Sequence, residues 1–442
     1  GALSRDSLNL FALAVKSLIT GDITALCGKV KTDLTQNILD IAAYMLEAGM
    51  YNEIVGLINA ADAVSPLCAM AIYLRMDITG ECGENTRPIG IVFPSRPFEK
   101  KLLEKRVAGC PDDGNAAYLL GCLLYHMKHY GKSDRIFAKQ ASENNDYRAY
   151  RCLSAVRYSH TSDKKSAAEA MRHASLLSDA SDRQITFESA YLMAKTGRSP
   201  REIADYILSR DNDRDDITVE LARAYNHMEK PEEAIKLLLG RNFVACEGGE
   251  HYIADQYMYA HYLIGSRKFA LGNYTAARRY FAAATVLPES LGSGLWNPVK
   301  EVPFRYFEAI CLLKEDRNKE AKEILGSFLK YRFDYFSDMY LPTLAFYVAR
   351  AHELLGDRQS GERLIREKLA VCRKQAEITD CGYFGTTPFF ISFIDRPDEA
   401  RKTFFAYQCL MYAHFLGDKK SEEYYRDIIG ADGYGTYIFD II

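Results

Sequence analysis

The sequence of 442 residues has little proline, a single tryptophan and no long apolar run. With 13 Pro, 48% hydrophobic and 26% charged residues, its composition is ordinary for a folded protein and favours helix over sheet. No stretch approaches the roughly 18 uninterrupted apolar residues of a membrane span, and the first residues do not form a signal sequence. We therefore expect a cytoplasmic protein.

A block of charge of one sign is also missing. The net charge of -3 is spread along the chain without a basic cluster or an acidic tail. Nucleic-acid binding and membrane-surface binding usually need such a cluster. We therefore expect neither nucleic acid nor a membrane as a partner.

Sequence patterns of metal, nucleotide and nucleophile sites are absent as well. The closest of the 11 Cys, Cys372 and Cys381, are nine positions apart, so no CxxC or zinc-knuckle spacing occurs. No glycine-rich phosphate loop, HExxH or GxSxG is present. His126 and His129 share a helix face without neighbouring ligands, which favours a surface pair. We expect free thiols in a reducing compartment, no metal, no cofactor and no catalytic residue.

A repeated helix-pair pattern is present instead. In YAHYLIGSRKFALGNYTAARRYFAAATVLP, Gly265 and Ala277 are small where two helices would cross closely. Tyr274 would fill the turn, Phe281 would reach the next pair, and Pro288 would end the second helix. This is the register of tetratricopeptide units, which pair two helices in ~34 residues and bury their apolar faces by stacking.

The same register recurs along the chain, clearly around Gly121 and Ala222 and more weakly elsewhere. We predict an all-α fold, a right-handed α-solenoid of roughly nine to eleven tetratricopeptide-type helix pairs. No sheet larger than a two-stranded piece around Ile89 to Phe93 is expected. The expected segments are amino-terminal helical repeats (1–80), a connecting segment (81–98), a central tetratricopeptide array (99–300) and carboxyl-terminal helical repeats (301–442).

The first helices of successive pairs line the concave surface of such a solenoid. The chain has 30 Tyr, and an aromatic, Arg-bearing concavity suits a peptide or a glycan stacked on rings. The alternative is that part of this set fills the space between repeats. The predicted groove residues are Tyr118, Tyr125, Arg223, Asn226, Tyr259, Tyr262, Phe269, Phe346 and Arg350.

Connections longer than helix pairs require occur at 80–97, 240–250, 288–298 and 380–398. The second and third flank the clearest helix pair, so we expect them to pack together into one composite surface. The alternative is that each loop caps its own helix, since Glu in a first turn favours the helix dipole. The predicted surface residues are Arg241, Glu247, Gly248, Gly249, Glu250, Trp296 and Asn297.

Signatures follow one another in a specific order between about Pro94 and Ile310. They are PSRPFEKKLLEK, CPDDGNAAYLLGCLLYHMKHY, YRCLSA, SRDNDRDDITVELARAYN, GRNFVACEGGEHY and LPESLGSG, with GYFGTTPFF later. This order resembles large bacterial proteins of unknown function, in which a mutarotase-like β-sandwich domain precedes a tetratricopeptide array. Genes for these proteins often lie among those of carbohydrate-degrading enzymes. Cys246 and Ser290 replace the Trp and Asn usual in that family.

The resemblance implies that this chain, which begins with Gly1, is the helical portion of a longer protein. The partner would then be its own amino-terminal β-domain, another protein or an oligosaccharide. We expect a non-catalytic interaction scaffold. The alternative is a helical-toroid carbohydrate-active enzyme that uses paired carboxylates, but a toroid needs long inner helices, whereas Gly121, Gly265 and Ala277 indicate short stacked pairs.

Overall fold

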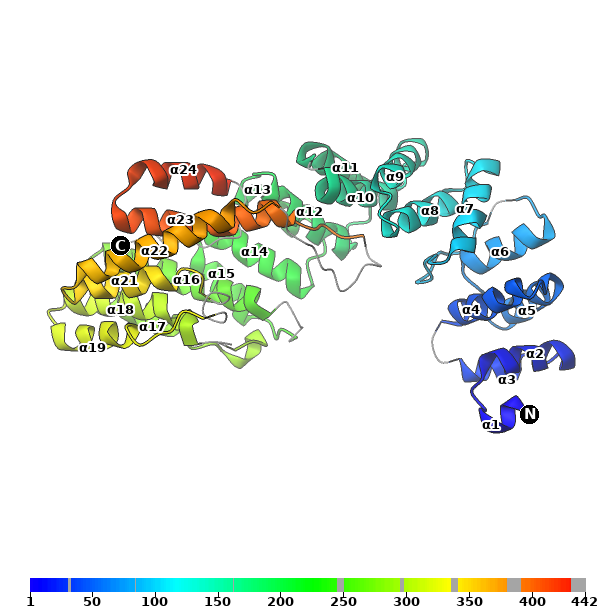
Figure 1. Ribbon diagram of the computed structural model, residues 1–442, viewed down its shortest axis with the longest axis horizontal. Helices are drawn as coiled ribbons and strands as arrows, with labels where there is room; N and C mark the ends of the chain where they lie inside the picture. The colour runs from blue at the N-terminus through cyan, green and yellow to red at the C-terminus, as the bar shows by residue number, and fades with distance from the viewer. Residues whose placement is uncertain are drawn as a thin grey trace. The chain divides into compact units, whose positions relative to one another are not determined.

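The computed structural model describes residues 1–30, 33–83, 85–161, 163–244, 250–294, 298–334, 341–379 and 391–430. Within these ranges every regular element is a helix and no strand occurs, so the all-α prediction is confirmed (Figure 1). The chain forms two compact units. Unit 1 comprises the described residues of Gly1–Leu177 and Thr386–Phe393, and unit 2 those of Ser178–Gly385 and Ile394–Ile442.

Unit 1 is built from helices that pack on their neighbours in sequence. Helix α4 packs against α5, α8 against α9, and α10 against both α9 and α11. Buried aliphatic side chains such as Ile38 and Leu57 form one hydrophobic cluster, and Phe137 and Val156 belong to a second. The helices are α1 (Ala2–Arg5), α2 (Leu10–Thr20), α3 (Thr24–Lys29), α4 (Leu34–Glu47), α5 (Tyr51–Val64), α6 (Ala69–Thr79), α7 (Pro97–Gly109), α8 (Gly114–His126), α9 (Tyr130–Asn144), α10 (Tyr147–Val156), the π-helix η1 (Arg157–Thr161) and α11 (Lys164–Leu177).

Unit 2 shows the stacking of pairs most clearly. Each helix contacts the next, and the first helices of successive pairs also touch, as α14 does α16 and α21 does α23. This double contact is how tetratricopeptide-type pairs bury a continuous core. The helices are α12 (Arg183–Lys195), α13 (Pro200–Leu208), α14 (Asp215–His227), α15 (Pro231–Leu239), α16 (Glu250–Ala270), α17 (Tyr274–Ala284), the 3₁₀ turns η2 (Glu289–Leu291) and η3 (Pro298–Glu301), α18 (Val302–Lys314), α19 (Asn318–Phe328), α21 (Leu344–Leu354), α22 (Arg358–Ala376), α23 (Pro397–Leu416) and α24 (Lys419–Ile429).

One turn recurs between the two helices of a pair. A residue just after the first helix takes a left-handed conformation, and the next N–H donates to the carbonyl five residues earlier at 2.8 to 3.0 Å. This bond satisfies a carbonyl left over at the helix end, and glycine suits the position because it has no Cβ. The left-handed residues are Gly49, Lys128, Gly197, Glu229, Gly272, Asp316, Gly356 and Gly417.

The two helices of a pair cross where the first one lacks a side chain. A Cβ on Gly121 would lie 2.5 Å from the Phe137 ring, and one on Gly265 would lie 2.6 Å from the Phe281 ring. Phe281 is fully buried, and its ring centroid lies 5.3 Å from that of Phe307 in the first helix of the next pair. The predicted roles of Gly265 and Phe281 are confirmed.

Helix α17 ends earlier than the sequence predicted. Its last residue is Ala284, and the Thr285 N–H donates to the Ala282 carbonyl at 3.3 Å. Such short-range bonds tighten and close a helix end. The prediction that Pro288 ends this helix is therefore wrong, because the chain has left the helix before reaching it.

The long connection before α7 is anchored by its apolar residues. Ile89 and Val92 are buried in the hydrophobic cluster of unit 1. The Ala69 N–H donates to the Pro88 carbonyl at 2.9 Å, which satisfies a donor at the start of α6. The apolar residues between Ile89 and Phe93 therefore hold the connection against α6 and form no strand.

Candidate functional site

Several predicted groove residues lie in the core. Tyr125, Asn226, Tyr262 and Phe346 expose 8%, 1%, 2% and 1% of their surface. The first helix of a pair packs against the first helix of its neighbour, as α14 does against α16, and this covers much of the face that would otherwise be open. These side chains fill the space between repeats, which was the alternative for this set.

The other predicted groove residues are half-buried, and each already has a partner within its unit. Their contacts are cation–π or aromatic pairs for three of them and polar bonds for the two arginines. The Arg148 guanidinium carbon lies 5.1 Å from the centre of the Tyr118 ring, and the ring centroids are 6.1 Å apart for Tyr259 and Tyr262 and 5.1 Å apart for Phe269 and Tyr274. Arg223 Nη1 lies 3.1 Å from a Glu220 carboxylate oxygen, and Arg350 Nε donates to the Tyr306 hydroxyl at 3.1 Å.

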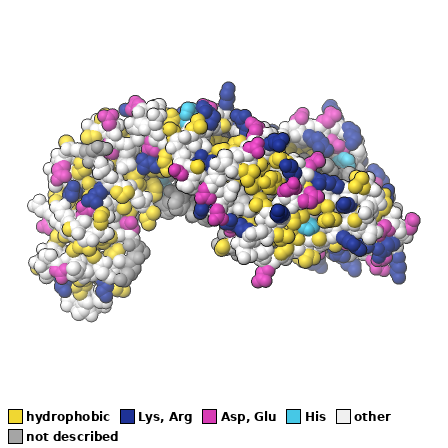
Figure 2. All heavy atoms as spheres, turned by 180° about the vertical axis from the view of Figure 1, so that it is seen from behind, with side chains coloured by type: hydrophobic (Ala, Val, Ile, Leu, Met, Phe, Trp, Pro, Cys, Tyr) yellow, Lys and Arg dark blue, Asp and Glu magenta, His cyan; other side chains and the backbone are white. Residues whose placement is uncertain are grey.

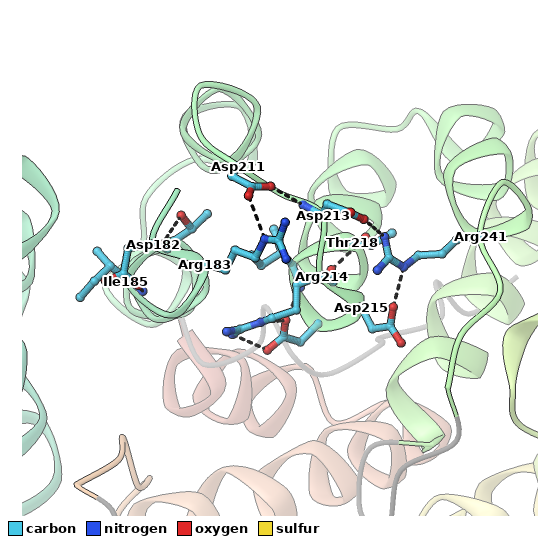
Figure 3. A network of polar contacts seen from close by, with 12 residues as sticks. Asp182, Arg183, Ile185, Asp211, Asp213, Arg214, Asp215, Thr218 and Arg241 are labelled. Carbon is cyan, nitrogen blue, oxygen red and sulfur yellow. Dashed lines mark hydrogen bonds and ion pairs between the residues drawn. The ribbon is translucent and has the colours of Figure 1, made fainter. Parts of the chain in front are cut away.

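Arg241 belongs to a network of carboxylates that precedes α14 (Figure 3). Its Nη1 donates to Asp213 at 2.7 Å and its Nε to Asp215 at 2.5 Å. These bonds raise the pKa of Arg241. On the other side, Arg183 of α12 donates to Asp211 at 2.8 Å. The segment SRDNDRDD is thereby tied both to α12 and to the chain that follows α15.

The two loops around the α16/α17 pair touch in their described parts. The Phe243 N–H donates to the Ser290 carbonyl at 2.8 Å, and Phe243 and Leu291 share one hydrophobic cluster. The composite surface itself remains a prediction, because most of its proposed residues are not among those described. Glu247, Gly248, Gly249, Trp296 and Asn297 lie outside the described residues, as does the side chain of Glu250, whose backbone begins α16.

A buried polar row joins α14 to α16. The Asn226 Nδ2 donates to the Gln256 carbonyl at 3.0 Å and to its Oε1 at 3.1 Å. Six residues earlier on α14, burial raises the pKa of Glu220, and the positive charge of Arg223 opposes that rise. The two bonds from Asn226 to Gln256 fix how α14 and α16 lie against each other.

The connection between α10 and α11 departs from the recurring turn. It is the π-helix η1, a geometry that is rare and frequently found at functional sites. The His160 ring stacks on Tyr130 with centroids 3.6 Å apart, and its Nε2 lies 3.1 Å from the Tyr125 hydroxyl. Burial lowers the pKa of His160. The ring is therefore neutral at pH 7 and serves as an anchor for η1.

A segment from far along the sequence lies against this π-helix. Ile391 exposes 7% of its surface and joins the same hydrophobic cluster as α10. The Ser159 hydroxyl donates to the Ser392 carbonyl at 3.3 Å. The Phe393 ring meets the Tyr158 ring edge-on, with centroids 5.6 Å apart. The segment belongs to neither helix nor strand, and unit 1 holds it by two side chains and one main-chain bond.

In unit 2, the first helix of the α12/α13 pair binds a second part of that segment. The Tyr191 hydroxyl donates to one oxygen of Asp395 at 3.0 Å, and Lys195 Nζ donates to the other at 2.8 Å. The Lys195 ammonium also lies 5.5 Å from the centre of the Tyr191 ring. The carboxylate thus has a specific cationic and hydroxyl-bearing receptor on α12.

Reasoning from the sequence missed Tyr158, Ser159 and the segment they hold. The signal available was the alternation of apolar residues at Ile391 and Phe393, a spacing of two that places side chains on one side of an extended chain. This alternation lies inside the connection at 380–398, for which the sequence analysis predicts no contacts. Nothing in the residues of η1 marks a π-helix.

In the described parts of both units, no three His, Cys, Asp or Glu side chains gather as metal ligands would, and no helix is long and apolar enough to span a bilayer. Acidic and basic side chains are interspersed on the face shown in Figure 2. Residues 391–393, which α10 and η1 hold within unit 1, and Asp395, which α12 holds within unit 2, are the features that point to a function.

No protein-family model and no curated protein matches the chain. Among solved structures, the human IFIT1 dimer with PPP-AAAA is similar over 96% of this chain and 94% of that chain, at 11% identity and a TM-score of 0.30. The P58(IPK) TPR domain covers 87% of this chain and 99% of its own, at 13% identity and a TM-score of 0.23. Similarities of this size identify neither a family nor a ligand for the chain.

Proposed function

We propose that the chain is a non-catalytic interaction scaffold that binds extended peptide segments on the first helices of its pairs. The observation that carries the proposal is that these helices already hold such a segment. In unit 1 it is Ile391 to Phe393 on α10 and η1, and in unit 2 it is Asp395 on α12.

The chemistry of these contacts suits peptide recognition. The Ser159 hydroxyl bonds a main-chain carbonyl, which every peptide offers. Tyr158 supplies a ring edge for an aromatic side chain, and Lys195 with Tyr191 supplies a receptor for a carboxylate. Backbone contacts of this kind give affinity, and side-chain contacts at alternate positions give specificity.

The finer description rests on the resemblance of the signatures. On that basis we propose that the chain belongs to a larger, carbohydrate-associated bacterial protein, and that its partner is the protein's own amino-terminal β-domain, another protein or an oligosaccharide. We propose the cytoplasm as its location. The half-buried Tyr259, Phe269 and Arg350 and the loop residues Arg241 and Trp296 are proposed to extend the contact surface.

The alternative function is a carbohydrate-active enzyme with paired carboxylates. One observation favours it, because a buried Glu220 with a raised pKa resembles a general acid. Arg223 lies 3.1 Å from that carboxylate, however, and an adjacent cation stabilises the ionised form rather than the protonated one. The scaffold is therefore preferred.

The test is to pan a displayed library of random peptides against the full chain and to titrate the enriched peptides by fluorescence anisotropy. Lys195→Glu should weaken acidic peptides at least fivefold, because it reverses the charge of their receptor. Lys236→Glu makes the same change on the exposed side of α15, a second helix, and should leave binding unchanged.

The proposal fails if no peptide is enriched or if Lys195→Glu and Tyr158→Ala leave every enriched peptide unaffected. A panel of oligosaccharides tests the alternative function, a carbohydrate-active enzyme. A rise in melting temperature with one of them, together with release of reducing sugar, would support the enzyme instead, because a ligand that binds only the folded chain stabilises it.

A further inference from the structure

We propose that Ile391 to Phe393 is a resident ligand, and that the site on α10 and η1 receives partner peptides with a branched aliphatic residue and a phenylalanine two positions apart. The inference rests on the proposed function and names the class of peptide that this site takes. A partner of this chemistry replaces the chain's own segment.

The first anchor of the site is apolar. Ile391 is almost fully buried in a cluster that includes Cys152, Leu153 and Val156 of α10. Burying an aliphatic side chain is favourable and burying an unpaired charge is costly, so a charged residue here is strongly disfavoured. A branched aliphatic side chain is the type that the position accepts.

The second anchor is aromatic and lies two residues further on. The Phe393 ring meets Tyr158 at an angle of 63° with centroids 5.6 Å apart, a favoured arrangement for aromatic pairs. In an extended chain, residues i and i+2 point to the same side, which matches two anchors on one surface. The spacing of two is therefore part of what the site selects.

The middle residue is held through its main chain. Ser159 donates to the carbonyl of Ser392, and the side chain at that position is not used in this contact. Tyr158 and Ser159, which make these two contacts, both belong to the π-helix η1. His160 of the same π-helix anchors it on Tyr125 and Tyr130. The recognised pattern is thus aliphatic, any residue, phenylalanine.

The resident segment sets the affinity of the site for partners. A tethered segment competes at an effective concentration that can reach the millimolar range. The apparent affinity of a free peptide is reduced by the fraction of molecules whose site is empty. Weakening the resident segment must therefore strengthen binding of the same sequence added in trans, which an ordinary structural contact does not predict.

The experiment uses a fluorescein-labelled ISFID peptide, the sequence of residues 391–395, and the full chain. The double variant Ile391→Asp, Phe393→Asp should bind the peptide at least tenfold more tightly than the parent, measured by anisotropy. Adding Tyr158→Ala and Ser159→Ala to that variant should remove the gain. A DSDID peptide, which lacks both anchors, should bind the double variant no more tightly than the parent.

Two further chains complete the test. Val371→Asp adds a charge at an exposed apolar residue elsewhere and should bind ISFID like the parent. Phe393→Leu keeps an apolar side chain, and so the fold, but loses the ring contact, and it should bind several-fold more tightly than the parent. If circular dichroism shows that the double variant is unfolded, the binding result for Phe393→Leu tests the inference in its place.

The inference is overturned if the folded variants bind ISFID no better than the parent. The peptide library distinguishes this result from failure of the proposed function. If library peptides bind in a way that depends on Lys195, the proposed scaffold function is supported and only the resident-ligand inference is wrong. Conversely, ISFID binding without any library peptide would show a site that serves the chain's own segment alone, which contradicts replacement by partners.

Discussion

Replacing Gly265 with alanine should destabilise unit 2, although alanine is the better helix former. The added Cβ would lie 2.6, 2.9 and 3.0 Å from three carbons of the Phe281 ring. That ring is fully buried, and its centroid is 5.3 Å from that of Phe307 and 6.2 Å from that of Tyr262. The ring is enclosed by packed neighbours, so it has little room to move away from the new Cβ.

The magnitude follows from two opposing effects. Overpacking a well-packed core costs about 1 to 3 kcal/mol. Removing a glycine from a helix interior returns about 0.5 to 1 kcal/mol. We expect a net loss of about 1 to 2 kcal/mol for Gly265→Ala. Gly326 of α19 is the matched control, because a Cβ there meets nothing within 4 Å, and Gly326→Ala should gain about 0.5 kcal/mol.

The assay is urea unfolding followed by circular dichroism, with hydrogen exchange of α16 to α18 as a local measure. Local exchange is needed because a chain of two units need not unfold in a single step. A Phe281→Leu background should reduce the loss from Gly265→Ala, giving a non-additive double-mutant cycle. If Gly265→Ala is as stable as Gly326→Ala, the close crossing of α16 and α17 is not real.

Three other predictions concern single features. Glu229→Gly should stabilise unit 2 by about 0.5 kcal/mol, because Glu229 has φ of 56°. Lys236→Gly in the middle of α15 should instead cost about 1 kcal/mol, and urea unfolding should show these opposite signs. Burial lowers the pKa of His160, so its contribution to stability is present above the ordinary pKa near 6.5 and is lost as pH falls. His160→Gln should therefore make the melting temperature of unit 1 depend less on pH between pH 7 and 5. An unchanged dependence on pH would contradict this. Arg241→Ala should cost about 1 kcal/mol and increase hydrogen exchange at the start of α14. Asp215→Asn should cost less, because Arg241 keeps its bond to Asp213. Equal protection from hydrogen exchange in both variants would argue against a stabilising role of Arg241.

The fold was predictable because it depends on local spacing. Small residues such as Gly121 and Gly265, followed at a fixed distance by Phe137 and Phe281, report where two helices of one pair cross. The left-handed turn was harder to recognise at Glu229, because charged residues rarely adopt that conformation. There the helix ending is imposed by the stacked pairs, against the preference of the residue.

The candidate site was less predictable because it depends on contacts between distant residues. The bond between Ser159 and Ser392 joins positions 233 residues apart. Likewise, whether Tyr262 or Tyr259 is covered depends on how α16 packs against its neighbours, and both lie on the face that the repeat register assigns to the groove. Periodicity assigns a face to a residue but does not say what covers that face.

The recurring turn makes the junctions of the chain unequal as places for grafting foreign sequence. Between α16 and α17, one inserted residue would break the bond from the Asn273 N–H to the Lys268 carbonyl and change the phase of the second helix. Between pairs, as from Leu239 to Glu250, the connection is already long. Lengthening it further costs only the slow logarithmic growth of loop-closure entropy. An epitope or a reporter domain is therefore best placed between pairs, where the spacing of the helices does not have to be kept.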